Sequence, residues 1–132
     1  MIVGIGLDLV EMARIEKAYK RFGLNFALRI LTPSEMASGN LTGEAVPGEV
    51  RFLASRFAAK EAASKALGTG FAHGVTLHGI EVVRHEGRRP EIIFMDSALG
   101  WAKKLNVTHG HLSISHEKSM VAATVVLENR LS

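Results

Sequence analysis

Apolar residues recur every three or four positions in the first half of the chain, and they alternate or run together in the second half. Met12, Ile15 and Tyr19 lie at helical spacing, and Phe22 extends the same apolar stripe. This pattern predicts an amphipathic helix that buries these four side chains. Gly23 is expected to end or kink the helix, because glycine adopts the left-handed conformation at helix ends without strain.

Four other segments of the first half carry local signals of their own. Residues 24–31 continue the helical spacing and predict a second helix. Residues 2–9 are apolar with two glycines that permit close backbone approach, which predicts a short buried strand that brings Asp8 to its end or just past it. Residues 32–35, with the sequence TPSE, form a capping box with proline in the first turn and predict a short helix. Residues 38–48 hold three glycines and a proline without periodicity and predict a surface loop.

A long alanine-rich helix is expected over residues 49–67, with Gly68 just past its end. Glu61, Lys65 and Gly68 follow one another at i, i+4 and i+7, so they share one stripe of this helix. A glutamate four residues before a lysine is the ordinary exposed ion pair of a helix surface. The neighbours on this stripe are small or apolar, however, which favours a functional site that faces another element.

The second half predicts strands and one further helix. The strands are expected over 76–84, 91–95, 111–116 and 120–128, and the helix over 97–105. The last two strands should form a hairpin. Helices early and hairpins late predict an α+β fold, in which an antiparallel sheet packs on the long alanine-rich helix. The length suits a single domain over residues 1–132.

Charge and composition narrow the class of protein. The formal net charge is +3, and the basic residues gather in two groups that would suit anionic partners. The groups are Arg14, Lys17, Lys20 and Arg21, and Arg51, Arg56, Lys60 and Lys65. The absence of cysteine excludes disulfides and thiolate metal sites. The first ten residues include Asp8, have no basic leader and are too few to span a membrane, so we expect a cytoplasmic protein without membrane attachment.

Asp8 and Glu61 are candidate metal ligands. Together they would supply two hard carboxylate oxygens of the kind that Mg²⁺ takes from proteins, with water and phosphate in its other positions. An aspartate at the end of a strand is also a common cap or turn residue, so this alternative stays open.

His116 is the candidate acid–base residue of the second half. Strand alternation puts it on the same face as Leu112 and Ile114, at a hairpin end where it would be partly buried. Histidine there would suit proton transfer or contact with phosphate, and a hydrogen-bonded structural histidine is the other interpretation. His109 and His111 share the opposite face and lack a third ligand at the spacing of a zinc site.

The sequence carries no recognisable phosphate-binding loop. The GxG at residues 4–6 lacks a third glycine, and Asp8 would repel a phosphate there. The glycines at 68 and 70 follow their helix, so they cannot offer its positive end to an anion. Two other classes of function remain as alternatives. The basic groups would suit a nucleic-acid-binding protein, and a zinc hydrolase would use His109, His111 and His116.

Three motifs together resemble the holo-acyl-carrier-protein synthases, the short class of 4'-phosphopantetheinyl transferases. They are GIGLDLVE at 4–11 with Arg14, RFAAKEA at 56–62 continued by KALGTG at 65–70, and SISH at 113–116. The resemblance spans nearly the whole chain and implies the fold of that family. It implies Mg²⁺-dependent transfer of 4'-phosphopantetheine from coenzyme A to a serine of acyl carrier protein in fatty acid biosynthesis, with release of adenosine 3',5'-bisphosphate.

The resemblance also implies roles for individual residues. Asp8 and Glu61 match the magnesium ligands, and Glu61, Lys65 and His116 are the expected catalytic residues. Lys65 would offset charge on the departing phosphate. The general base stays open between Glu61, a metal-bound water and His116, and contact with the 3'-phosphate is the other role for His116. The residues expected to bind substrate are Arg56, Lys65, Gly68 and His116, together with Arg14, Lys17 and Arg21 of the helix that docks the acidic carrier protein.

Members of this class are trimers with sites between subunits, so the resemblance implies a homotrimer without a nucleic-acid partner. The apolar run at 120–127 fits a strand that is buried on both faces and contributes to a subunit interface. The turn at 87–90, GRRP, departs from the family pattern of glycine, one basic residue and proline by one extra residue.

Overall fold

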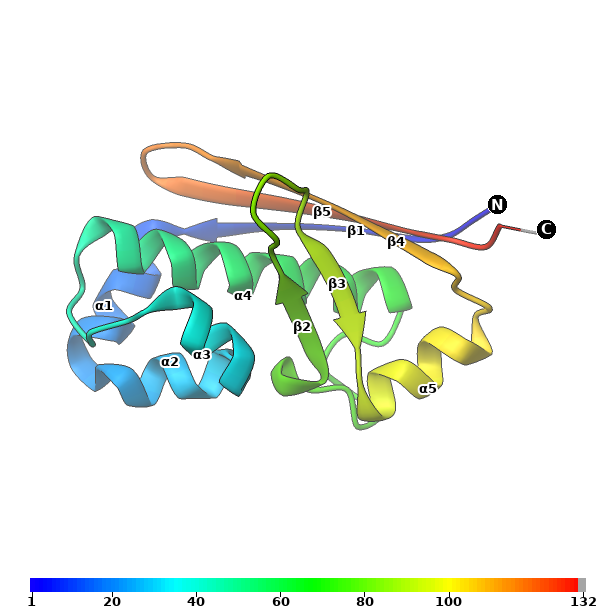
Figure 1. Ribbon diagram of the computed structural model, residues 1–132, viewed down its shortest axis with the longest axis horizontal. Coiled ribbons are helices and arrows are strands. Elements are labelled where there is room, and N and C mark those ends of the chain that lie inside the picture. Colours follow the sequence, from blue (N-terminus) through cyan, green and yellow to red (C-terminus); the bar gives the residue numbers. More distant parts are fainter. Residues whose placement is uncertain (131–132) are drawn as a thin grey trace.

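The computed structural model describes residues 1–130, and its central element is the helix α4 (Pro47–Leu67). This helix lies between a sheet and a layer of shorter elements (Figure 1). The sheet is antiparallel with the order β1-β5-β4. Its strands are β1 (Ile2–Glu11), β4 (His109–His116) and β5 (Met120–Glu128). The predicted α+β fold, with an antiparallel sheet packed on the long alanine-rich helix, is therefore confirmed.

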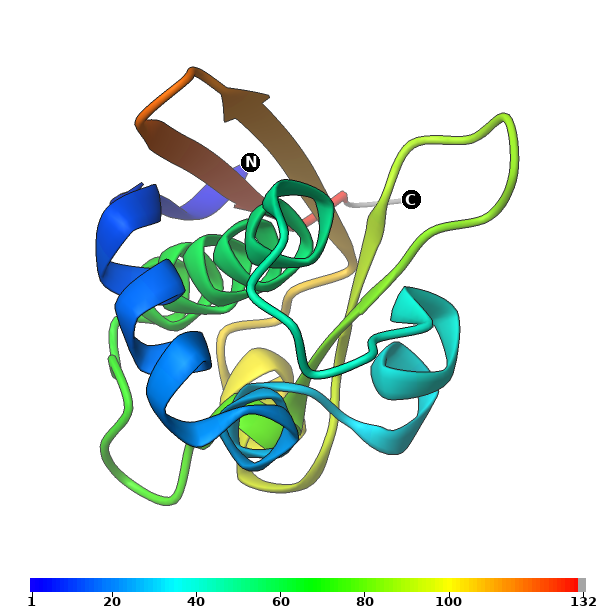
Figure 2. The ribbon, with the colours of Figure 1, turned by 90° about the vertical axis from the view of Figure 1, so that its left-hand side faces the viewer.

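The other side of α4 is covered by short helices and a second, two-stranded antiparallel sheet (Figure 2). The helices of this layer are α1 (Met12–Phe22), α2 (Leu24–Ile30), α3 (Pro33–Gly39), the 3-10 turn η1 (Leu77–Gly79) and α5 (Asp96–Lys104). The two strands are β2 (Ile80–Val83) and β3 (Glu91–Phe94). Within residues 1–130, the helices are too short or too polar for any of them to cross a membrane.

The packing of β1 on α4 depends on two glycines. A Cβ atom at Gly6 would overlap the carbonyl oxygen of Ala62, and one at Gly4 would overlap that of Ala66. The strand backbone therefore lies directly on the helix backbone, a closeness that only glycine on the strand allows. Any larger side chain at Gly4 or Gly6 would force β1 away from the helix.

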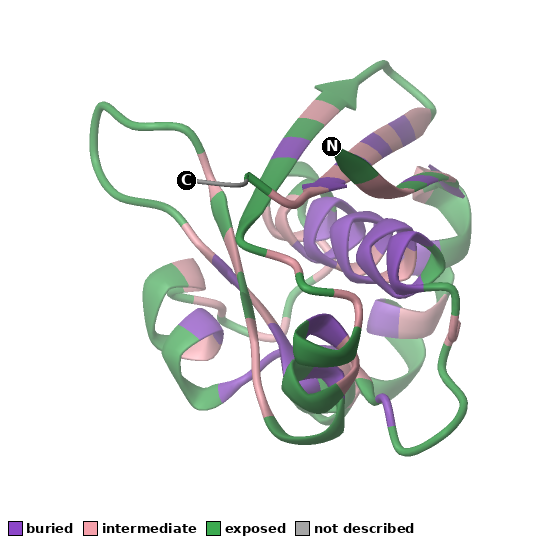
Figure 3. Ribbon diagram, turned by 90° about the vertical axis from the view of Figure 1, so that its right-hand side faces the viewer, coloured by how far each residue is buried: buried purple, intermediate pink, exposed green. Residues whose placement is uncertain are grey.

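The two faces of the main sheet differ sharply in exposure. The inner face packs on α4 and buries Val10, Val121 and Val125 (Figure 3). The outer face consists of Ile5, Leu7 and Leu9 of β1 with Ala122, Thr124 and Val126, which lie directly opposite them on β5. Ile5, Leu7 and Leu9 are 61%, 57% and 62% exposed, so the predicted burial of the strand at residues 2–9 is wrong for one face of this strand in the single chain. The reason is that a helix covers only one side of the sheet.

Local sequence signals predicted several boundaries well. Thr32 caps α3, and both hydrogen bonds of the capping box with Glu35 are present. Gly23 separates α1 from α2, and Gly68 ends α4 in the left-handed conformation. The hairpin of β4 and β5 forms as expected, and α5 lies within one residue of its predicted start and end.

Three local predictions need correction. The loop predicted over residues 38–48 is shorter, because α3 continues to Gly39 and α4 already begins at Pro47, where proline suits the first helical turn. The strand predicted from residue 76 begins only at Ile80, after the 3-10 turn. Phe22 is 46% exposed rather than buried, with the guanidinium groups of Arg21 and Arg29 near its ring.

Lys60 is the largest departure from the sequence prediction. It is grouped in the sequence with basic residues that would suit anionic partners, yet it has no exposed surface and pairs with the buried Glu35 at 2.6 Å. This buried ion pair, Lys60 with Glu35, is called the closed pair below.

Candidate functional site

Asp8 and Glu61 come together where β1 crosses α4. Gly6, two residues before Asp8 on the same face of β1, lies against Ala62, the residue that follows Glu61. The negative charge of Asp8 acts on the Glu61 carboxyl group, as expected for two carboxylates in one site. The structure therefore unites two residues that are far apart in the sequence.

Lys65 lies at the same site and forms an ion pair with Asp8. Its Nζ atom lies 2.8 Å from Oδ1 of Asp8 and donates a further hydrogen bond of 3.3 Å to the carbonyl oxygen of Leu7. The hydrogen bond to Asp8 is the main reason that the pKa of Lys65 is raised. The ordinary i, i+4 ion pair with Glu61 does not form among the described residues, since Lys65 reaches to the strand instead.

Glu61 is held in an environment that opposes its negative charge. Burial is the largest cause that raises the pKa of Glu61, and repulsion from Asp8 adds to it, while Lys65 and Arg14 act in the opposite direction. No side chain or backbone group within residues 1–130 donates a hydrogen bond to its carboxylate. A carboxylate without a donor beside a second carboxylate is a favourable place for a cation.

Gly68 shapes the end of the helix next to this site. It adopts φ +81° and donates its backbone N–H to the carbonyl oxygen of Lys65 at 2.9 Å. A Cβ atom there would meet no neighbour within 4 Å, so the positive φ alone makes glycine favourable at this position. The structure places Gly68 one turn beyond Lys65, as the sequence predicted.

A cationic pocket of about 400 Å³ lies below β4, at the opposite edge of the sheet from β1. The predicted residues Arg56 and His116 both line it. Arg84 and Arg89 add two further positive charges from the turn between β2 and β3. Sequence reasoning missed both arginines, because nothing local shows that this turn folds over β4. Its only signal was the lengthened GRRP turn.

Arg56 is buried without a full set of partners. It is 9% exposed, and its guanidinium carbon lies 4.1 Å from the centre of the Phe52 ring. Nη1 donates a hydrogen bond of 3.1 Å to Oγ of Ser55, but the buried Nε has no partner among the described residues. Native proteins rarely leave buried donors unpaired, so this group is suited to an anionic ligand.

His116 lies on the predicted face of β4 but is exposed, so its predicted partial burial is wrong. It is the last residue of the strand. Desolvation is still the largest cause that lowers the pKa of His116, followed by the positive charges of Arg51, Arg56 and Arg84. An anion bound in the pocket would counteract these positive charges and raise the pKa of His116.

A second cavity, of about 330 Å³, lies beside α1 and is mainly apolar. Ile15, Phe57 and Leu77 contribute apolar walls, and Arg14 and Arg29 contribute guanidinium groups. Of the three basic residues predicted to bind a protein partner, only Arg14 lines this cavity. Lys17 and Arg21 are exposed elsewhere on α1.

The zinc site considered from the sequence does not form within one chain. His111 lies opposite Val126 on the outer face of the sheet, whereas His116 lies on the inner face. The described residues contain no group of three histidine, aspartate or glutamate side chains that could hold a metal ion.

Comparison with known proteins gives a consistent result. Residues 4–125 match the 4'-phosphopantetheinyl transferase superfamily. A holo-[acyl-carrier-protein] synthase from Desulfovibrio desulfuricans is 49% identical over 129 residues, which cover 97% of this chain and 98% of the relative.

Two solved structures have the same fold. The holo-[acyl-carrier-protein] synthase of Neisseria meningitidis has a TM-score of 0.85 and 38% identity, covering 98% of this chain and 100% of its own. That of Bacillus anthracis, in complex with CoA (3',5'-ADP), has a TM-score of 0.80 and 40% identity, covering 98% and 99%. The chain therefore belongs to the 4'-phosphopantetheinyl transferase superfamily.

Proposed function

We propose that this protein transfers the 4'-phosphopantetheine group of coenzyme A to a serine hydroxyl of an acyl carrier protein in fatty acid biosynthesis. The observation that carries the proposal is the convergence of Asp8, Glu61 and Lys65 where β1 crosses α4. The relatives named for this activity, and the related structure with a coenzyme A nucleotide, support it.

The reaction exchanges one bond to phosphorus for another. The serine oxygen bonds to the phosphorus that carries pantetheine, and the bond from that phosphorus to the bridging oxygen breaks. The serine gives up its proton, and adenosine 3',5'-bisphosphate leaves. Such transfers need positioning and charge neutralisation more than covalent participation by the protein.

Asp8 and Glu61 are the residues that would hold Mg²⁺. Two neighbouring carboxylates, one of them without a hydrogen-bond donor, match the preference of this ion for a few protein oxygens with its other positions open. When bound, Mg²⁺ supplies neutralisation of the pyrophosphate charge.

Lys65 is placed to stabilise the departing phosphate. Its side chain is half exposed, and its single carboxylate contact within residues 1–130 is to Asp8, so its ammonium group is free to turn toward an anion bound beside Asp8. Glu61 is the residue we assign as acceptor of the serine proton, because its carboxylate has no hydrogen-bond donor within residues 1–130 and burial raises its pKa.

The cationic pocket below β4 would hold the 3'-phosphate of the nucleotide. Arg56 offers a buried guanidinium group with an unpartnered Nε, and His116 lies on the same pocket. Charge-assisted hydrogen bonds to a phosphate are among the strongest that an arginine makes.

The cavity beside α1 would dock the carrier protein. Its apolar walls lie between Arg14 and Arg29, so a partner with an apolar side chain flanked by acidic groups would match it. An acidic carrier protein docked there would present its serine near Glu61. The positive charge of Arg14 acts on the carboxyl group of Glu61, which indicates that the cavity and the carboxylate site are neighbours.

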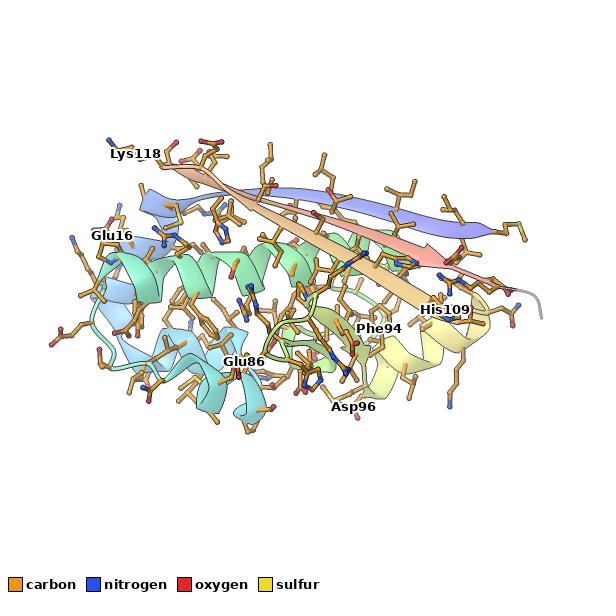
Figure 4. The ribbon with its side chains drawn as sticks, turned by 45° about the horizontal axis from the view of Figure 1, so that its top comes forward. Glu16, Glu86, Phe94, Asp96, His109 and Lys118 are labelled. Atoms are coloured by element: carbon orange, nitrogen blue, oxygen red, sulfur yellow. The ribbon has the colours of Figure 1, made fainter. Side chains whose placement is uncertain are left out.

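We also infer a homotrimer that uses the outer face of the sheet. His109 at the start of β4 and Lys118 in the turn before β5 mark the two ends of this hairpin, and side chains project from the strands between them (Figure 4). The exposed Ile5, Leu7 and Leu9 are unusual on a free surface. The carboxylates lie at one edge of the sheet and the cationic pocket at the other, so two subunits would share one coenzyme A molecule.

The central experiment is a mass-shift assay. Purified protein, Mg²⁺ and coenzyme A are mixed with apo carrier protein, and the carrier should gain the mass of one phosphopantetheine. Chelation of the metal should prevent the gain. Salt-dependent binding to DNA without any mass gain would contradict the proposal and favour the nucleic-acid alternative.

The oligomeric state is tested by the substitution Leu7→Lys, with Leu99→Lys on the exposed surface of α5 as its matched control. A charge on the outer face should convert the trimer to monomers in analytical ultracentrifugation, whereas the control should stay trimeric. A wild-type protein that sediments as a monomer at all concentrations would contradict the trimer.

A further inference from the structure

The closed pair is a complete hydrogen-bonding unit inside the protein. The ammonium group of Lys60 donates to Oε1 of Glu35 at 2.6 Å and to the carbonyl oxygens of Ile30 at 2.6 Å and Leu77 at 2.9 Å. An ammonium group has three donors, so all of them are used. Lys60 is fully buried, and Glu35 is 1% exposed.

Glu35 completes the unit from the other side. Its Oε1 also accepts the backbone N–H of Thr32 at 2.8 Å, and its Oε2 accepts that of Val82 at 2.8 Å. The closed pair therefore links the end of α2, the start of α3, α4, η1 and β2. Burial is the largest cause that lowers the pKa of Lys60, and the charge of Glu35 acts against it.

Stability alone is a weak explanation for such a pair. Removing two charges from water costs several kcal/mol per ion, and two apolar side chains of similar volume often stabilise a core equally well. A buried pair is better explained where it fixes positions that apolar packing would leave variable.

The two carbonyl groups that Lys60 holds belong to residues of the docking cavity. Ile30, at the end of α2, and Leu77, at the start of η1, both line the cavity of about 330 Å³ beside α1. They come from segments 47 residues apart, and neither belongs to the main sheet. A second link between these segments is the exposed contact of 2.7 Å from a ring nitrogen of His78 to the carbonyl oxygen of Leu28.

We propose that Lys60 is a positioning residue for recognition of the carrier protein. Through its hydrogen bonds to Ile30 and Leu77, it keeps two walls of the docking cavity at a fixed separation. This inference rests on the proposed function, because it assigns the cavity to the carrier. Lys60 itself touches neither substrate nor the reacting atoms.

The main test replaces both members of the closed pair, Lys60→Met with Glu35→Gln, since the single change would leave a buried carboxylate without its cation. We expect KM for the carrier to rise about tenfold, as for loss of one well-packed interface contact. Both kcat and KM for coenzyme A should stay within about twofold of the wild-type values. Lys103→Met, an exposed lysine of α5, is the matched control and should change none of these constants.

Chemical rescue separates positioning from packing. The chain has no cysteine, so Lys60→Cys can be alkylated with 2-bromoethylamine in the unfolded state and refolded, which restores an ammonium group at nearly the same place. The rescued protein should recover the KM of the wild type for the carrier. Failure to recover it in a folded, active protein would overturn the proposal.

Two further outcomes decide the matter. An unchanged carrier KM in the double variant, or an equal rise in both KM values, would overturn the proposal and leave the transferase activity established. A wild-type protein that modifies no carrier would remove the proposed function and this inference together.

If the double variant does not fold, NMR of the wild type replaces it. Methyl signals of Ile30 and Leu77 should shift on titration with apo carrier, while those of Ile93 on β3 should not. Unshifted signals from the two cavity residues would overturn the proposal.

Discussion

Lys60 and Arg56 are both buried cations of α4, one turn apart, and they differ in how many of their donors have partners. All three donors of Lys60 are used inside the protein, whereas Nε of Arg56 has no partner within residues 1–130. Glu61, which follows Lys60 directly, resembles Arg56, because its carboxylate also lacks a donor in the described part of the chain. We call Arg56 and Glu61 the open charges.

The difference between Lys60 and the open charges distinguishes charged residues that support the fold from charged residues that bind a ligand. A charge whose partners are all internal has no capacity left for a ligand. A buried or partly buried charge whose hydrogen-bonding capacity is unused carries a desolvation cost, and a bound ligand of opposite charge offsets that cost. Removing Lys60 alone should therefore affect folding first, because it leaves Glu35 buried without its cation, and replacing an open charge should affect chemistry and ligand binding directly.

The largest expected effect is on the open charge Glu61. Glu61→Gln should lower kcat/KM for carrier modification about 1000-fold, because it removes both a magnesium ligand and the proposed proton acceptor. The melting temperature should stay the same or rise, since burial and Asp8 both disfavour the charge of Glu61. Mass spectrometry of the carrier and thermal unfolding followed by circular dichroism measure the two quantities.

The control for this substitution is Glu91→Gln, on the exposed side of β3. It makes the same chemical change outside the site and should keep full activity. Activity of Glu61→Gln within threefold of the control would remove the metal and base assignments together.

The second largest expected effect is a loss of stability when the closed pair loses Lys60. Lys60→Met alone should lower the free energy of unfolding by about 3–5 kcal/mol, because Glu35 stays buried without its cation. Lys65→Met, the same change one turn later, should lower it by less than about 1 kcal/mol, since the ion pair with Asp8 is half exposed. Urea unfolding curves compare the two variants, and equal losses would mean that burial does not distinguish these lysines.

For the open charge Arg56 we expect the reverse of the result for Lys60: substitution should weaken coenzyme A binding and leave stability nearly unchanged. Arg56→Met should leave stability unchanged or raise it slightly, because it removes a buried donor without a partner. KM for coenzyme A should rise about tenfold, the loss expected for one hydrogen bond to a charged group. Dephospho-coenzyme A, which lacks the 3'-phosphate, is the matched substrate.

With that substrate, the variant and the wild type should have nearly equal KM values. An equal penalty with both substrates would show that Arg56 acts on some other part of the nucleotide.

The sequence predicted the features that depend on neighbouring residues. The TPSE capping box, the glycine that ends α4 and the hairpin of β4 and β5 all follow from short-range rules, and the structure confirms them. Glycines 4 and 6 were recognised as positions of close backbone approach, and they are the reason that Asp8 reaches the flank of α4.

The features that failed depend on contacts between distant segments. Lys60 was grouped with basic residues that would suit anionic partners, because no local pattern indicates that it pairs with Glu35, 25 positions earlier. Arg84 was expected at the end of a strand and Arg89 in a turn, and neither was expected at a site, because their approach to the pocket depends on how the β2–β3 hairpin folds toward β4. The exposure of Ile5, Leu7 and Leu9 also escaped prediction, since an apolar pattern cannot tell burial by a helix from burial by another subunit.

The smallest expected effect is the pH dependence of stability that arises from His116, which lines the same pocket as the open charge Arg56. Desolvation and the charges of Arg51, Arg56 and Arg84 lower the pKa of His116 below the ordinary value of 6.5. The unfolded chain therefore takes up this proton more readily than the folded chain as the pH falls below 6.5. The contribution of His116 to stability should accordingly decrease with falling pH in that range and level off above it.

NMR titration of the ring proton of His116 measures this pKa directly. Adenosine 3',5'-bisphosphate should raise the pKa, because a phosphate in the pocket favours the charged imidazolium over the neutral ring. Arg56→Met should raise it by a smaller amount in the free protein, since desolvation, the largest cause, remains. A pKa at or above 6.5 that does not respond to the nucleotide would place the 3'-phosphate outside this pocket, and Arg56 would then be an open charge without a ligand.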